Sequence, residues 1–424
     1  MAHAVAVESL SAPAAQDTSS NATQCVPSCV NQYRSLSGIV LSCLTTVFLC
    51  VWVSLHLNIP EPMNTRDLGH LNRIKIQTKI FVRCRVVPIL VTLMVPEWAL
   101  GMAALQFCKA NQLANKLATT RQQAFFILMG GFHLFKRSKE ASLYGIREKN
   151  REGSQPLAGE SALEASLPSN KTINAVEEDF GEPLHPLDEF DICHLIKSGK
   201  LCLPTPAELQ DKCKSDGLAK FLVLVQVLWF ITQCIGRKVS GLPLTELEVI
   251  TLGYTLLTVA MYIAWWDKPY QVTFPVRVYE TLPERTDGQD DGDANLRNTK
   301  GIPMFHSGYK DHRAESVGRT IMFTVGTLFG TIHFLAWFSP FPSSRMQFLW
   351  RFATIVVTVV PPAMIVVAGL TLLVHRLFGV LLVYIPILYL VGRGITIVMA
   401  FKGLAHLPPD AYRDVEWSDF FPHI

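Results

Sequence analysis

Seven long runs of apolar residues alternate with polar segments along this chain. A helix rises ~1.5 Å per residue, so about 20 apolar residues match the ~30 Å hydrocarbon core of a bilayer. Lipid offers no partner to backbone N–H and C=O groups, so such runs must form helices packed against one another. The sequence therefore predicts an all-α fold, a polytopic membrane bundle of seven long transmembrane helices. The runs are Gly38–Asn58, Val86–Cys108, Leu218–Ile235, Leu247–Trp266, Thr320–Trp337, Phe352–Val374 and Val380–Phe401.

An eighth apolar segment, Ala124–Phe135, is shorter than the other seven and contains a Gly-Gly pair. Its length suits a re-entrant or interfacial segment better than a full crossing. If the segment is re-entrant, the chain crosses seven times and its two termini lie on opposite sides of the membrane. If it crosses, there are eight crossings and the termini lie on the same side. Basic residues in the short loops do not decide between these topologies.

The polar segments between the runs divide the chain into six parts. The two long loops are rich in Glu, Ser, Gly, Pro and Asp, a composition typical of flexible linkers. The predicted parts are a polar N-terminal tail (1–37), a first transmembrane part with the short apolar segment (38–135), a hydrophilic loop (136–217), a transmembrane hairpin (218–278), an acidic loop (279–319), and three spans with the C-terminal tail (320–424).

The orientation follows from the charges around the first run. Arg34 is the only basic residue close to its start, whereas residues 59–85 carry six Lys and Arg against two acids. The positive-inside rule therefore places the N-terminus on the extracytoplasmic side of a plasma or internal membrane. We read the first run as a signal anchor that is not cleaved, and Asn21 in Asn-Ala-Thr as a glycosylation site on the external tail.

Composition supports a membrane protein, and the sequence shows no feature that indicates nucleic-acid binding. Of the 424 residues 49% are hydrophobic, and the net charge is only +3. No basic run with interleaved aromatic residues is present. The expected partners are the lipid bilayer and, as a candidate, a small apolar ligand; the oligomeric state stays open. Cys193, Cys202 and Cys213 lack the paired close spacing of a zinc site, and neither a metal nor another cofactor is expected.

Two charged residues lie well inside the apolar runs. Glu97 follows Pro96 in the middle of the second run, and Arg393 stands between Gly392 and Gly394 in the last one. A charge in the hydrocarbon centre costs at least ~2.5–3.5 kcal/mol, so such residues usually face the protein interior. We predict that Glu97 and Arg393 form a polar pair inside the bundle. The pair fixes helix register, or it belongs to a polar pathway or binding pocket.

His333 is the only histidine deep inside a long run. A buried histidine or carboxylate can act as a general base, so His333 and Glu97 are weak candidates for catalytic residues. A hydrogen-bonded packing histidine is the simpler interpretation. The motif Trp265-Trp266-Asp267-Lys268-Pro269 ends the fourth run, and there we expect Trp265, Trp266 and Asp267 to anchor the helix at the headgroup boundary.

The order of several short motifs resembles a family of uncharacterised multi-pass membrane proteins from fungi. The resemblance implies architecture and a fungal source, and it implies no activity, so no catalytic role is carried over. Phe338 stands where the resemblance leads us to expect Asn. The motifs are His56–Pro60, Pro96–Trp98, Met129–Phe132, Asp211–Gly217, Leu242–Glu248, Trp265–Pro269, His333–Trp337, Leu349–Arg351, Leu407–Asp410 with Trp417, and Phe421–His423.

Known catalytic signatures are absent from the sequence. It contains no GxSxG elbow, no HExxH, no Walker loop, no CxxCH and no histidine-rich di-iron set. We therefore favour a non-enzymatic protein for permeation, sensing or scaffolding, with the Glu97/Arg393 pair as its polar site. The alternative is a membrane-embedded enzyme that acts on a lipid or isoprenoid with His333 or Glu97 as acid or base.

Overall fold

The computed structural model describes residues 33–62, 69–136, 181–214, 217–283, 296–371 and 375–417. Asn21, the expected glycosylation site, lies outside these residues, as do most of the first long loop and part of the second.

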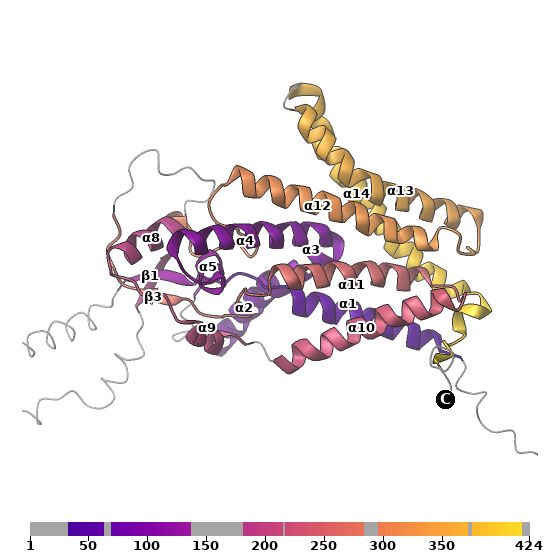
Figure 1. The fold of residues 1–424 in the computed structure, drawn as a ribbon, viewed down its shortest axis with the longest axis horizontal. Coiled ribbons are helices and arrows are strands. Elements are labelled where there is room, and N and C mark those ends of the chain that lie inside the picture. Colours follow the sequence, from indigo (N-terminus) through magenta and orange to yellow (C-terminus); the bar gives the residue numbers. More distant parts are fainter. Residues whose placement is uncertain are drawn as a thin grey trace, which may run out of the picture.

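Six helices in the described part of the chain are long and apolar enough to cross a membrane. Each coincides with one of the predicted runs, which confirms the all-α bundle. Helices α1, α10, α11 and α12 run along the long axis of the molecule (Figure 1). The six are α1 (Leu36–Ser54), α10 (Gly217–Val239), α11 (Glu246–Ala264), α12 (His312–Ile332), α13 (Ser344–Thr371) and α14 (His375–Gly403).

A small polar cap lies at one end of the bundle, which we call the cap end. Its three-stranded sheet has the order β2-β1-β3, with β1–β2 antiparallel and β1–β3 parallel. Ile59, just after α1, donates its N–H to the Met129 carbonyl in the cap at 2.9 Å. The cap comprises α5 (Arg121–Leu128), β1 (Phe132–Lys136), β2 (Glu182–Pro186), α8 (Glu189–Lys197), α9 (Pro206–Lys212), β3 (Val276–Val278) and the 3₁₀ turn η4 (Leu296–Asn298).

The short apolar segment Ala124–Phe135 belongs to this cap and contains no helix long enough to cross a membrane. It forms the last turn of the eight-residue α5, a glycine turn and most of β1. Gly130 has φ +85°, and Gly131 packs so closely on the Phe126 ring that a Cβ would lie 2.4 Å from it. The chain therefore reverses within two residues, and the apolar side chains on both sides of the turn fill the cap core.

Both ends of the described chain meet at the opposite end of the bundle, the terminal end. Tyr33 forms a β-bridge with Arg413, and the Arg34 N–H donates to the Tyr412 carbonyl at 2.7 Å. Arg34 also pairs with Glu248 in the first turn of α11. Because the chain begins and ends at the same end, it traverses the bundle an even number of times. Three 3₁₀ turns lie at this end: η5 (His333–Ala336), η6 (Leu404–His406) and η7 (Pro409–Tyr412).

The second predicted run, Val86–Cys108, is not a single straight crossing. It is divided at Val95, and the helices on its two sides are bent by 113°. Proline at 96 has no N–H to continue the first helix, and Val95 takes a non-helical conformation with φ −139° and ψ 68°. With the helix that leads into it, the run forms four helical segments. They are α2 (His70–Phe81), the π-helical turn η2 (Val82–Val86), α3 (Val87–Met94) and α4 (Pro96–Leu117).

Both arms of this helical hairpin open toward the cap end. Arg85 lies 5.9 Å from the ring of Trp52, near the end of α1, and Gln106 on α4 contacts Trp265 at the end of α11. The tip, by contrast, touches Tyr254, eight residues from the start of α11 and ten from its end. The hairpin therefore enters the bundle about halfway and returns toward the cap end, which is the geometry of a re-entrant loop rather than of a straight crossing.

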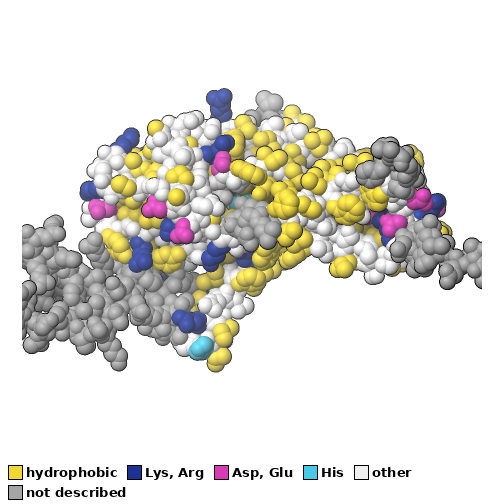
Figure 2. Space-filling model, turned by 60° about the horizontal axis from the view of Figure 1, so that its bottom comes forward, with side chains coloured by type: hydrophobic (Ala, Val, Ile, Leu, Met, Phe, Trp, Pro, Cys, Tyr) yellow, Lys and Arg dark blue, Asp and Glu magenta, His cyan; other side chains and the backbone are white. Residues whose placement is uncertain are grey.

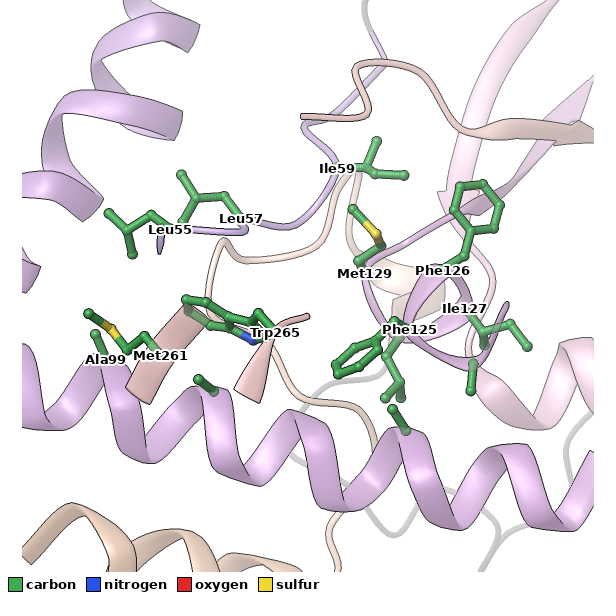
Figure 3. Close-up of a cluster of buried hydrophobic side chains, with 14 of the residues drawn as sticks. Leu55, Leu57, Ile59, Ala99, Phe125, Phe126, Ile127, Met129, Met261 and Trp265 are labelled. Atoms are coloured by element: carbon green, nitrogen blue, oxygen red, sulfur yellow. The ribbon is translucent and has the colours of Figure 1, made fainter. Parts of the chain in front are cut away.

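The cap and the bundle share one hydrophobic core. Leu55 and Leu57 after α1, Met261 and Trp265 of α11, and Phe125 of α5 converge on α4 (Figure 3). On the face shown in Figure 2, hydrophobic side chains cover much of the middle, while charged ones gather toward the two ends. The cap is thus packed onto the helices that surround the hairpin.

Candidate functional site

The tip of the hairpin is built from a broken helix. A continuous helix would bond the Leu93 carbonyl to the N–H of residue 97, but the break at Val95 leaves that carbonyl exposed to the bundle interior. The Tyr254 hydroxyl of α11 donates to it. Proline is favoured at the first position of a helix, so Pro96 both ends α3 and starts α4.

Glu97 stands in the first turn of α4, where the helix dipole favours a negative charge. Its side chain is buried, with 5% of the residue exposed. Gly326 of α12 makes room for it, because a Cβ on Gly326 would lie 3.3 Å from Glu97 Cγ and 3.1 Å from Pro361 Cγ. The local sequence therefore directs a carboxylate into the middle of the bundle.

Arg393 of α14 is fully buried beside the tip. It donates from Nη2 to the Tyr254 hydroxyl at 2.6 Å, and its guanidinium carbon lies 4.3 Å from the centre of the Phe329 ring. A Cβ on Gly392 would meet Val356 at 2.9 Å, whereas Gly394 has open space. Only the first of the two flanking glycines is therefore needed for close helix packing.

Glu97 and Arg393 share one buried cluster but make no direct hydrogen bond among the described residues. The charge of Arg393 still acts on the Glu97 carboxylate. Tyr389, one turn before Arg393 on α14, lies close to the same carboxylate, although its hydroxyl makes no hydrogen bond among the described residues. Glu97 and Arg393 therefore lie near each other without a direct hydrogen bond, and Tyr254 and Tyr389 lie beside them.

His333 lies in the same cluster, on the side of the terminal end. It is fully buried, and its Nδ1 lies 3.0 Å from the Phe329 carbonyl, to which this N–H donates. The Phe329 ring separates it from Arg393, with ring centres of Phe329 and His333 5.0 Å apart. The histidine is held by its own helix.

We call Glu97, Tyr254, His333, Tyr389 and Arg393 the tip cluster. Several of its polar atoms are buried without a hydrogen-bond partner among the described residues. Buried polar atoms normally have hydrogen-bond partners, so several unpaired polar atoms in one place indicate that a molecule other than the chain forms hydrogen bonds with them. The orphan atoms are Glu97 Oε2, His333 Nε2, Tyr389 Oη, and Nε and Nη1 of Arg393.

The three residues predicted to anchor the end of α11 at the membrane interface differ in their environments. Trp266 is 64% exposed, as a boundary residue should be, whereas Trp265 is fully buried and donates from Nε1 to Gln106. Asp267 pairs with Arg121 at 2.6 Å at the cap end, far from the tip cluster. Trp265 therefore holds α4 against α11 and does not face headgroups.

Lys268 forms a second buried polar group at the cap end. Its Nζ donates to Asn58 Oδ1 and Gln106 Oε1, both at 2.9 Å, and it lies over the Trp265 ring. Burial holds the pKa of Lys268 well below its ordinary value. Neutral amides accept from an amine without needing its charge, so this group ties the segment after α1 to α4 and the end of α11.

The tyrosines of the tip cluster and the amides around Lys268 were missed by sequence reasoning. Tyrosine is ordinary in a membrane helix, and nothing in the local pattern distinguishes Tyr254 or Tyr389 from the other tyrosines. The one available signal was spacing, because Tyr389 precedes Arg393 by four residues and so shares its helix face.

Metal chemistry has no visible basis in the described segments, which contain no group of three His, Cys, Asp or Glu side chains placed to hold an ion. Comparison with known families shows a match of residues 193–286 to a family of unknown function (DUF8562). That segment runs from α8 to just beyond β3 and includes Tyr254 and Lys268, but not Glu97 or Arg393. No curated protein and no solved structure matches the chain.

Proposed function

We propose that this protein is a non-enzymatic multi-pass membrane protein that binds a small polar solute at the tip cluster and conducts it through the bilayer. The observation that carries the proposal is the set of orphan polar atoms around a half-membrane hairpin. Irregular backbone at this depth is tolerated only where it is buried in protein or lines a cavity. A solute or water molecule would supply the missing hydrogen bonds.

Charge balance favours a neutral or zwitterionic solute over an ion. Glu97 and Arg393 have opposite formal charges, so with both groups ionised the site has no net charge to attract an ion. A fixed guanidinium also repels cations and protons along a narrow path. The donors and acceptors of the tip cluster suit hydroxyl, amide or urea-like groups. This polar lining argues against the small apolar ligand expected from the sequence.

The polar groups lie at three levels between the two ends of the bundle. Lys268 and Gln106 lie at the cap end, and Glu97 is nine residues before Gln106 on α4, or ~14 Å along the helix. His333 lies seven residues beyond Gly326 on α12, ~10 Å further toward the terminal end. The Phe329 ring lies between Arg393 and His333, where an apolar side chain would close a pathway.

The enzyme alternative receives less support from the geometry. A lipid or isoprenoid substrate would approach from the bilayer, so its acid or base would need to face lipid. Glu97 is 5% exposed and His333 fully buried, and both point into the bundle.

The test is solute flux in proteoliposomes. The full chain is reconstituted, and re-swelling after a hyperosmotic shift of urea, glycerol or erythritol is followed by stopped-flow light scattering. We expect at least one solute to enter ten times faster than in empty liposomes. Glu97→Gln should reduce this rate at least tenfold, because it removes the charge that balances Arg393. Glu246→Gln, a buried carboxylate on α11 outside the cluster, should leave it unchanged.

Two results would contradict the proposal. One is re-swelling no faster than in empty liposomes for all three solutes. The other is equal loss in Glu97→Gln and Glu246→Gln, which would indicate a general effect on the fold.

A further inference from the structure

The helix that leads into the hairpin carries a cationic face that the described chain leaves uncovered. Helices α2 and η2, residues His70–Val86, contain no buried residue. We call this segment the basic arm. Its apolar side chains are unusually open, with Leu71 76%, Ile74 54% and Phe81 50% exposed. An exposed apolar stripe of this kind marks an interaction surface.

The charges of the arm are all of one sign. Arg73, Lys75, Lys79, Arg83 and Arg85 lie within it, and the sequence has no Asp or Glu between Asp67 and Glu97. Among the described residues no carboxylate forms an ion pair with the first four of these cations. The arm therefore presents cations to whatever surrounds it.

The apolar and basic residues form two parallel stripes. Leu71, Ile74 and Phe81 recur at the spacing of one helix face, and Lys75, Lys79 and Arg83 follow at intervals of four on the adjacent face. A helix with this pattern lies in the membrane interface, with the apolar stripe in the acyl chains and the cations at the headgroups.

The geometry of the hairpin places the arm at that depth. Helix α4 runs alongside α11 and α12 (Figure 1), and the helix His70–Met94 makes an angle of 113° with it. Its 25 residues therefore rise only ~15 Å along the bundle axis, about half the hydrocarbon thickness. With the tip at mid-bilayer, the start of α2 reaches the headgroup level at the cap end. Arg85, ten residues before the tip, lies only ~6 Å along the axis from it, and its guanidinium reaches the ring of Trp52 near the end of α1, as a snorkelling cation does.

We infer that the basic arm binds anionic phospholipid headgroups in the leaflet at the cap end. Charge complementarity selects anionic over zwitterionic lipid, and the adjacent apolar stripe selects a lipid surface over a soluble acidic partner. The arm continues directly into α3, so bound lipid would hold the near side of the hairpin. This inference does not depend on solute conduction.

The experiment counts lipids on the purified full chain. Native mass spectrometry in detergent is carried out with phosphatidylglycerol or phosphatidylcholine at matched concentrations. Wild type should retain phosphatidylglycerol at least tenfold more tightly, and 0.5 M salt before exchange should abolish the preference. The variant Lys75→Gln/Lys79→Gln/Arg83→Gln should weaken phosphatidylglycerol binding roughly a hundredfold.

A matched variant removes three exposed cations elsewhere in the cap and its loops: Lys197→Gln/Lys212→Gln/Lys300→Gln. It should bind phosphatidylglycerol within threefold of wild type. The inference fails if the two triple variants lose binding equally, if the arm variant binds as wild type does, or if wild type does not prefer the anionic lipid. Loss of a co-purifying protein with lipid binding unchanged would make the arm a protein interface instead. The lipid preference of the wild type and its salt dependence test the inference even if a variant does not fold.

Discussion

At the scale of single residues, the tip cluster depends on one hydroxyl. Tyr254 accepts from Arg393 and donates to the carbonyl freed by the break in the second run. It thus joins α14, α11 and the hairpin through two hydrogen bonds in the buried interior of the bundle. Leaving a buried donor or acceptor unpaired costs ~1–3 kcal/mol.

Tyr254→Phe should therefore destabilise the protein by roughly 2–5 kcal/mol, because it leaves both the Leu93 carbonyl and an Arg393 N–H without a partner. The measurement is thermal unfolding in detergent, followed by intrinsic tryptophan fluorescence. Tyr384→Phe makes the same chemical change at an exposed position of α14 and should alter stability by less than ~0.5 kcal/mol. Equal unfolding temperatures for the two variants would show that the Tyr254 hydroxyl does not contribute this stability.

Sequence reasoning at the residue level can single out a polar side chain that stands in an apolar run. Glu97, Arg393 and His333 are conspicuous in apolar runs, and the structure brings all three together. The same reasoning misplaced Trp265, because a tryptophan next to Asp-Lys-Pro satisfies the interfacial pattern whether it faces lipid or α4. Its buried partner, Gln106, is 159 positions away in the chain. A contact between residues so far apart in the sequence produces no local sequence pattern.

At the scale of elements, the re-entrant hairpin is the largest departure from expectation. Val86–Cys108 has the length of a crossing, and a proline in its middle is equally compatible with a kinked crossing. A kink and a reversal have the same sequence signature, since proline ends the first helix in either case. The direction of the chain after Pro96 depends on the residues that pack against the tip, among them Tyr254 and Gly326.

The hairpin predicts which positions share a side of the membrane. Gln77→Cys and Asn111→Cys, in a variant without accessible native cysteines, should react with a membrane-impermeant maleimide from the same side. Ser343→Cys at the terminal end should react from the other. All three positions are exposed. Sealed, oriented vesicles and a mass shift on gels give the readout. Labelling of positions 77 and 111 from opposite faces would instead make the second run a seventh crossing.

The strands and helices of the cap could not be predicted from the sequence, because they too depend on contacts between distant residues. Its central strand β1 pairs with β3, some 140 residues later in the chain, and both strands are short. Phe132 and Phe135 made Ala124–Phe135 look like a membrane segment, whereas they face the cap core, which the sequence does not reveal.

At the scale of the whole molecule, cap and bundle share a core and should respond to acid together. His133 on β1 is buried and His306 beside Gln106 is half-buried, and their partial removal from solvent lowers the pKa of each to about 4. The charge of His185 adds to this at His133, and that of Lys109 at His306. Glu189 in α8 acts in the opposite sense, because burial raises the pKa of its carboxyl.

The unfolded chain, with histidine pKa values near 6.5, binds more protons than the folded one between pH 6.5 and pH 4. The stability contributed by the neutral histidines is therefore complete above pH 6.5 and is lost as the pH falls toward 4. The loss is on the order of 3 kcal/mol for each histidine. Thermal unfolding in detergent at pH 7.5, 6 and 4.5 should show it. His133→Gln/His306→Gln should flatten the pH dependence, whereas His70→Gln on the exposed α2 should not. If the double variant keeps the full slope, acid sensitivity arises elsewhere and the two histidines are not what couples the cap to pH.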